Sequence, residues 1–156
     1  FDRLVLSTDP AMLVVTANGP DGPAGCLVGF STQASITPER FLVLLSKQNR
    51  TYRVAQDSPV LVVHVLRESD TQIAEHFGGQ TGDDVDKFAD IETIEGPGGV
   101  PIVVGLDWFA GRVLRQFYCG DHVGFLLAAH EGSAVRADEP PLVLGDAEHI
   151  EPGHSA

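Results

Sequence analysis

Cysteine is scarce in this sequence, and its two cysteines, Cys26 and Cys119, belong to no recognisable motif. They lack the C-x-x-C pair and the His/Cys spacings of zinc sites, so the sequence indicates neither a zinc site nor a disulfide-rich secreted scaffold. We expect both to be buried free thiols. A disulfide between the two is the alternative.

Long hydrophobic runs are also missing, since none approaches the ~20 residues that span a bilayer. No targeting segment is recognisable in the sequence, which starts at Phe1. We therefore expect a cytoplasmic protein without membrane contact.

Basic residues are outnumbered, with 10 Lys and Arg against 22 Asp and Glu and a formal net charge of -12. Such a surface repels the phosphates of nucleic acid and of anionic membranes, and no basic stripe counters the total charge. Nucleic acid and membranes are therefore poor partners. A small anion is still compatible, because a few local donors decide that contact.

The common catalytic motifs are absent from the sequence. Residues 28–32 lack the second glycine of a nucleophile elbow, and the six His residues show no H-E-x-x-H spacing. There is no P-loop and no G-x-G-x-x-G, so a bound nucleotide would need another arrangement. We expect no metal site.

Short apolar, β-branched segments recur along the 156 residues, separated by turns rich in Gly, Pro, Asn and Asp. This pattern predicts a mainly β protein, and the length predicts a single domain over residues 1–156. Asn18 to Gly22 predicts the tip of a hairpin. The predicted strands cover residues 12–16, 26–30, 41–45, 60–66, 100–104, 111–118 and 123–129.

Two short helices are predicted between these strands. Asn49 is the expected N-cap of a helix near residues 51–56. Ser69 and Gln72 match a capping box before a second helix that reaches Phe77.

Two further segments are polar and acidic. Residues 80–95 predict a long loop. Residues 145–156 have the composition of a solvated tail.

One apolar strand becomes polar after Phe30, where the sequence runs Ser31, Thr32, Gln33, Ala34, Ser35. A fully buried strand does not carry several polar side chains unless they are hydrogen-bonded. The segment is either a strand edge that faces water or part of a cleft for a polar ligand.

Ser46 to Thr51 connect an apolar strand to the helix that Asn49 caps. Free N–H groups at a helix start, together with hydroxyl and basic side chains, favour anions. The alternative is an ordinary turn with a solvated Lys47 and Arg50. The donors suited to a phosphate monoester are Ser46, Asn49, Arg50 and Thr51.

Gly120, Asp121 and His122 lie between two apolar strands. Gly120 permits a tight bend, and Asp121 could orient His122 by accepting a hydrogen bond from its ring. The alternative is a hairpin turn with a surface histidine.

Taken in chain order, these segments resemble the flavin reductase-like family, whose fold is the FMN-binding split barrel. The resemblance covers residues 9–144 and includes Asp86-Lys87-Phe88 and Gly120-Asp121-His122. It implies an antiparallel Greek-key split β-barrel with a few short helices. It also implies a homodimer with the flavin at the dimer interface.

The resemblance further implies roles for single residues. His122 would be the catalytic residue, near the flavin ring or the nicotinamide. The residues implied for cofactor binding are Phe30, Ser31, Thr32 and Gln33 along the ring and ribityl chain, Ser35 and Ser46 toward the phosphate, Asn49, Arg50 and Thr51 at the phosphate, and also Ala34 and Lys47.

The implied function is NAD(P)H-dependent reduction of FMN or FAD, with FMN as the expected bound cofactor. NADH or NADPH would be the reductant, and a flavin-dependent monooxygenase is a candidate recipient of the reduced flavin. The alternatives are a non-catalytic FMN-binding or redox-sensing module, a related barrel that binds a deazaflavin or haem, and a barrel without cofactor.

Two features depart from the family pattern. The family often has two prolines after the polar strand, whereas Pro38 is followed here by Glu39. After residues 141–144 the sequence becomes acidic rather than aromatic and basic. These departures affect the substrate-side wall more than the phosphate site.

Overall fold

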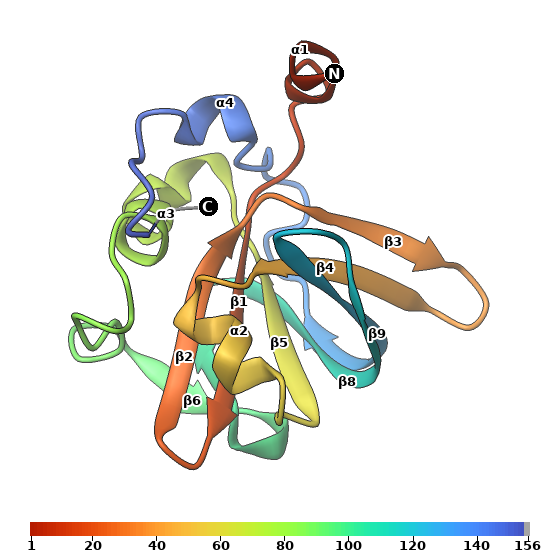
Figure 1. Ribbon diagram of the computed structural model, residues 1–156, viewed down its shortest axis with the longest axis vertical. Coiled ribbons are helices and arrows are strands. Elements are labelled where there is room, and N and C mark those ends of the chain that lie inside the picture. The colour runs from red at the N-terminus through yellow and green to blue at the C-terminus, as the bar shows by residue number, and fades with distance from the viewer. Residues whose placement is uncertain (155–156) are drawn as a thin grey trace.

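An antiparallel sheet of seven strands forms the body of the protein, in the order β2-β1-β5-β8-β9-β4-β3 (Figure 1). The computed structural model describes residues 1–154. A two-stranded sheet, β6-β7, lies beside it. The strands are β1 (Leu13–Gly19), β2 (Gly22–Val28), β3 (Ser31–Ser35), β4 (Arg40–Ser46), β5 (Val60–Val65), β6 (Thr93–Glu95), β7 (Pro101–Val103), β8 (Asp107–Tyr118) and β9 (His122–Ser133).

The helices are short and lie between the strands or at the chain ends. In Figure 1, α1 stands away from the sheet and the C-terminal end returns beside α3. The helices are α1 (Asp2–Leu6), α2 (Arg50–Ala55), α3 (Thr71–Gly78) and α4 (Leu144–Ala147), with single 3-10 turns η1 (Glu68–Asp70) and η2 (Pro97–Gly99).

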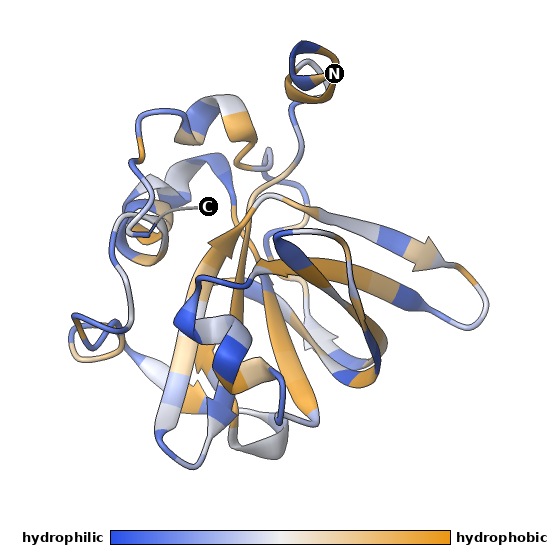
Figure 2. Ribbon diagram, in the orientation of Figure 1, coloured by the Kyte–Doolittle hydropathy of each residue, from blue (hydrophilic) through white to orange (hydrophobic). Residues whose placement is uncertain are grey.

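Strand β1 is apolar without alternation because both of its faces are covered. Leu13 and Val15 point into a core cluster with Phe125 and Leu127, whereas Val14 points into a second cluster with Phe77. Successive side chains of a strand face opposite sides, so a strand between two cores needs apolar residues at every position. Figure 2 shows this concentration of hydrophobic residues along β1, β4 and β5.

In the seven-stranded sheet, hairpins join β1 to β2, β3 to β4 and β8 to β9, and the remaining pairs link strands that are distant in sequence. The predicted mainly β, antiparallel architecture is confirmed. Within residues 1–154, the edge strands β2 and β3 do not pair with each other, so the hydrogen bonding of the sheet is open at this point.

Of the local motifs predicted from the sequence, the hairpin and the helix N-cap form, whereas the capping box does not. The predicted hairpin joins β1 to β2, and Gly22 takes a positive φ of 105°. The predicted N-cap also forms, since Asn49 Oδ1 accepts from Thr51 N at 2.9 Å. The Ser69 capping box is wrong: Asp70 accepts from Arg67 N at 2.7 Å, and Ser69 Oγ accepts from Arg136 instead.

The C-terminal segment, residues 144–154, is not the solvated tail that its composition predicts. Ala147 is buried, and Ile150 packs on the cluster that contains Phe77. Gly153 N donates to Gly78 O at 3.2 Å. Although the segment is acidic overall, a few apolar residues pack against α3 and fix its position. Residues 155 and 156 lie outside the described residues.

His64 is fully buried and joins three strands. Its Nε2 accepts from Val103 N at 3.0 Å, so Nδ1 carries the proton and donates to Val14 O at 3.1 Å. Burial lowers the pKa of His64 from 6.5 to about 4. The imidazole is therefore neutral and serves as a structural bridge.

Asp107, at the start of β8, is a second buried polar centre. Its carboxylate accepts from Arg67 at 3.0 Å and from the main-chain N–H groups of Val135 and Arg136. Burial alone would raise the pKa of Asp107, but these hydrogen bonds lower it. The carboxylate is thus ionised and ties β8 to the chain after β9.

The two cysteines are free, so the alternative of a disulfide between them is wrong. Cys26 is buried as expected, whereas Cys119 is exposed. None of the helices among residues 1–154 is long and apolar enough to cross a membrane.

Candidate functional site

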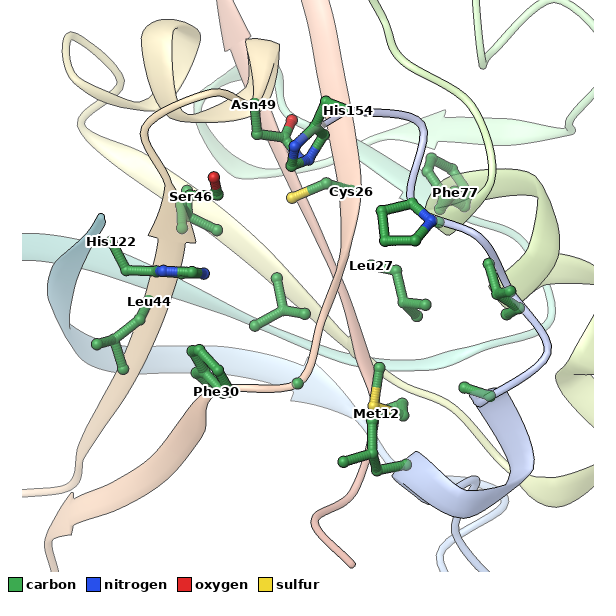
Figure 3. A pocket seen from close by; sticks show the side chains of 18 of the residues that line it. Met12, Cys26, Leu27, Phe30, Leu44, Ser46, Asn49, Phe77, His122 and His154 are labelled. Carbon is green, nitrogen blue, oxygen red and sulfur yellow. The ribbon is translucent and has the colours of Figure 1, made fainter. Parts of the chain in front are cut away.

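A cavity of about 320 Å³, called the apolar cavity below, opens between the ends of β2 and β4 and the C-terminal segment (Figure 3). Most of its lining is hydrophobic, and a flat uncharged group would be desolvated there at little cost. Its apolar walls include Met12, Leu27, Val28, Leu44, Phe77 and Ile150.

One end of the apolar cavity is polar. Ser46, Asn49, His122 and His154 line it, and Figure 3 shows them on the side opposite Met12. A few polar groups at one end of an apolar pocket fix the orientation of a ligand. The cavity therefore suits a molecule with a flat apolar part and a polar end.

Pairing between β4 and β9 brings His122 to this end, because the register places it opposite Ser46. His122 Nδ1 donates to Asp121 Oδ1 at 2.7 Å, as the sequence predicts. This hydrogen bond lowers the pKa of Asp121, and the charge of His122 adds to the effect. The Phe30 ring lies 4.9 Å from the imidazole, so both rings form one side of the cavity mouth.

At the start of α2, side chains rather than main-chain groups are the available donors. Asn49 already caps the helix, since its Oδ1 accepts from Thr51 N and its carbonyl from Tyr52 N. The side-chain donors at this point are Asn49 Nδ2, which lies 3.2 Å from His154 Nε2, and the guanidinium of Arg50, which reaches Asp21 O at 3.4 Å. The helix start thus offers fewer N–H groups than the sequence suggests.

Cys26 lines the apolar cavity as well, a position that no sequence motif predicts. Burial raises the pKa of its thiol. The sulfur is therefore protonated and acts as part of an apolar wall.

The polar strand lies outside the apolar cavity. Ser31 and Ser35 on β3 are half-buried and the three residues between them are exposed. Gln33 Nε2 donates to Ser35 O at 3.2 Å, a bond within the strand. Lys47 is exposed too, with Nζ 4.9 Å from the centre of the Tyr118 ring.

The structure therefore gathers only part of the predicted site. Four of the predicted residues line the apolar cavity, namely Phe30, Ser46, Asn49 and His122. Arg50 and Thr51 line a neighbouring cavity of about 420 Å³, called the polar cavity below. The β3 side chains belong to an edge strand of the sheet, where a second molecule could meet them.

The polar cavity lies between the β1–β2 turn, the start of α2 and residues 82–88. Lys87 is buried there, and its Nζ donates to Gly25 O at 3.0 Å and Phe77 O at 2.9 Å. Burial lowers the pKa of Lys87. Because two carbonyls hold this ammonium group, Lys87 anchors the loop to β2 and α3.

The C-terminal segment is the part of the site that sequence reasoning missed. Leu144, Ala147, Ile150, Pro152 and His154 all line the apolar cavity. The first three recur at every third position, which was the one apolar signal in an acidic stretch. Within residues 1–154, no group of His, Cys, Asp or Glu side chains is arranged to hold a metal ion.

The cavity walls and the nearby side-chain donors are of the chemical types that a flavin nucleotide requires. The apolar cavity suits a flat aromatic ring system, and Asn49 at its polar end and Arg50 in the neighbouring polar cavity are donors for a phosphate. Arg50 supplies a positive charge in a chain with few of them.

A family model described as flavin reductase like domain matches residues 7–150. The 4-hydroxyphenylacetate 3-monooxygenase reductase component of Pseudomonas aeruginosa is 28% identical over 129 residues, 81% of this chain and 76% of that protein. An FMN reductase (NADH) RutF of Klebsiella pneumoniae is 28% identical over 131 residues, 83% of this chain and 78% of the relative.

A diflavin flavoprotein of Nostoc sp. is 24% identical over 140 residues, and this chain, matched over 88% of its length, spans 24% of that larger protein. Among solved structures, a flavin reductase domain protein from Arthrobacter sp. FB24 has a TM-score of 0.79 at 18% identity. The similarity covers 92% of this chain and 90% of that one, which shows a shared fold.

Proposed function

We propose, from the premise that this chain belongs to the flavin reductase like domain family, that it binds a flavin and reduces it with a nicotinamide nucleotide. The names of its relatives support this: one is an FMN reductase (NADH) and another is the reductase component of a monooxygenase. FMN and NADH are accordingly the proposed first choices, with FAD and NADPH as the alternatives to be measured. All of residues 1–156 would form one domain.

The observation that carries the proposal is the apolar cavity with its single polar end. Phe30 and His122 flank its mouth, and Val28 and Leu44 line its wall. We propose that the flavin ring lies against these residues. Asn49 and Arg50 would hold the phosphate, with Ser46 and the buried Thr51 hydroxyl close by.

When bound, the flavin supplies the hydride-accepting chemistry, and the protein supplies position and electrostatics. Asp121 holds the His122 imidazole by its Nδ1 proton, which leaves Nε2 to face the incoming nicotinamide. The apolar walls exclude water from the ring. His122 thus acts as a positioning group at the mouth of the site.

A homodimer is part of the proposal, because apolar side chains are exposed next to the site. Leu114, Phe117 and Tyr118 on β8 are 37%, 38% and 75% exposed, and Phe30 is 52% exposed. An exposed apolar patch of this kind marks an interaction surface. A second copy would cover it and bring a β3 edge toward the cavity mouth, where Ser31 to Gln33 could meet the flavin. Sedimentation equilibrium tests this, and a monomer at all concentrations contradicts it.

The partner in turn would be a monooxygenase that consumes reduced flavin, as the name of the Pseudomonas relative suggests. The apolar cavity is open to solvent, so a flavin could leave it after reduction.

The function is tested by adding FMN or FAD to the purified chain and following the oxidation of NADH and NADPH in air. We expect protein-dependent oxidation of one donor above the rate of free flavin. Flavin binding without oxidation of either donor would favour a non-catalytic flavin-binding module. A protein that binds no flavin would contradict the proposal.

A further inference from the structure

The cationic side chains at α2 already have an internal anionic partner. Arg53 Nη2 donates to both carboxylate oxygens of Asp83, at 2.6 and 2.5 Å. Asp83 belongs to the loop that lines the polar cavity with Arg50. A carboxylate in this position makes the kind of charge-assisted hydrogen bonds that a phosphate oxygen would make.

The charges around Asp83 support this comparison. The hydrogen bond from Arg53 lowers the pKa of Asp83, and the positive charges of Arg53 and Arg50 lower it further. Two cationic side chains of α2 thus act on one carboxylate. This is the electrostatic environment that an anionic ligand would favour.

Asn49 has an internal partner as well. Because its Oδ1 accepts from Thr51 N, the orientation of its amide is fixed and Nδ2 points to His154 Nε2 at 3.2 Å. Nδ2 can only donate, so His154 Nε2 accepts. The imidazole therefore occupies one of the two hydrogens that Asn49 Nδ2 could donate to a phosphate oxygen.

Both internal partners lie on segments that pass close to the start of α2. A Cβ atom at Gly82 would lie 3.0 Å from Arg50 Cδ, so the loop before Asp83 lies directly on Arg50. A Cβ at Gly153 would lie 2.4 Å from the carbonyl carbon of Gln80, so the segment before His154 crosses directly on the start of that loop, where only glycine fits. The chain is built to bring Asp83 and His154 to these donors.

The Asp83 contact is also easily exchanged. The side chains of Arg53 and Asp83 are 47% and 48% exposed, and exposed ion pairs contribute little to stability. A phosphate monoester carries more negative charge than one carboxylate and has three acceptor oxygens. An incoming phosphate can therefore outcompete the Asp83 carboxylate.

We propose that Asp83 and His154 compete with the flavin phosphate for the positive charges of Arg50 and Arg53 and for Asn49 Nδ2, and so set the affinity and release of the flavin. This inference rests on the proposed function. The two side chains imitate the acceptor oxygens of the ligand, and each must move when the phosphate binds. A reductase that hands its flavin to a second enzyme gains a built-in means of release.

The test compares FMN with riboflavin, which has the same ring but no phosphate, by quenching of flavin fluorescence. Asp83→Asn should tighten FMN binding by about two- to fivefold, the worth of an exposed ion pair, and leave riboflavin unchanged. Asp90→Asn is the matched control, because it removes one charge from the same loop. His154→Ala should act like Asp83→Asn, with His149→Ala as its control in the same segment.

The experiment distinguishes failure of the competition from failure of flavin binding. If Asp83→Asn and His154→Ala leave the ratio of FMN to riboflavin affinity at the value of their controls, or lower it, the inference is overturned while flavin binding stands. If the unmodified protein binds neither flavin, the proposed function itself fails. A higher ratio in both variants, but in neither control, supports the competition.

Discussion

Two sets of polar groups in this protein differ in how they are held. His64 and Asp107 are buried, and each is bonded to partners from distant segments of the chain. Asp83 and Asp121 are exposed, and each pairs with one side chain near a cavity. The first set holds strands together and cannot change partners, whereas the second can exchange its partner for a ligand.

The largest expected effect comes from breaking the buried set. Asp107→Asn removes the charge that Arg67 faces and should lower the free energy of unfolding by about 3–5 kcal/mol. Asp83→Asn breaks an exposed pair and should cost less than about 1 kcal/mol. Urea denaturation of both variants measures the difference. Equal losses of unfolding free energy in the two variants would contradict the distinction between the buried and the exposed set.

The next largest expected effect is a dependence of folding stability on pH, which is caused by His64. The unfolded chain binds a proton at His64 below pH 6.5, but the folded protein does so only near pH 4. Stability is therefore complete above pH 6.5 and falls by about 3 kcal/mol as the pH drops to 4. Asp107, with its lowered pKa, adds a further loss at still lower pH.

Thermal unfolding at pH 7 and pH 4.5 measures this effect. His64→Gln keeps a donor and an acceptor but does not titrate, so its stability should fall less between the two pH values. If the variant and the unmodified protein lose the same amount, His64 is not the group responsible.

Substitutions of Asp121 and His122 at the cavity mouth should have the smallest effects on folding and the clearest effects on function. His122→Ala should reduce turnover about tenfold while FMN affinity changes less than about twofold, because positioning mainly affects the reacting complex. Asp121→Asn should reduce turnover by a smaller factor, since the imidazole is only less well oriented. Steady-state kinetics and FMN titration separate the two quantities, and equal loss of both would exclude a positioning role.

The sequence predicted what depends on neighbouring residues. The turn at Gly22, the cap at Asn49 and the Asp121–His122 bond all join residues close in the chain, and all three form. The Ser69 capping box failed because Arg136, from a distant segment, takes that hydroxyl. The order of the sheet and the packing of residues 144–154 on α3 depend on distant contacts that composition does not reveal.

The same limit applies to the site. Ser46 and His122 meet through the register of β4 with β9, and Ile150 reaches the apolar cavity across α3. The polar residues of β3 drew attention as a local pattern, yet they lie on an edge strand outside the cavity. Their predicted contact with flavin depends on a second copy of the chain.

The central claim is that this chain positions a flavin for reduction by a nicotinamide nucleotide. The most direct test mixes the protein with one equivalent of FMN, removes air, adds NADH or NADPH, and follows the visible absorbance of the flavin. The account predicts that the flavin band bleaches faster with protein than without it, and faster with NADH. A flavin band that decays at the rate of free FMN with both donors would contradict the account.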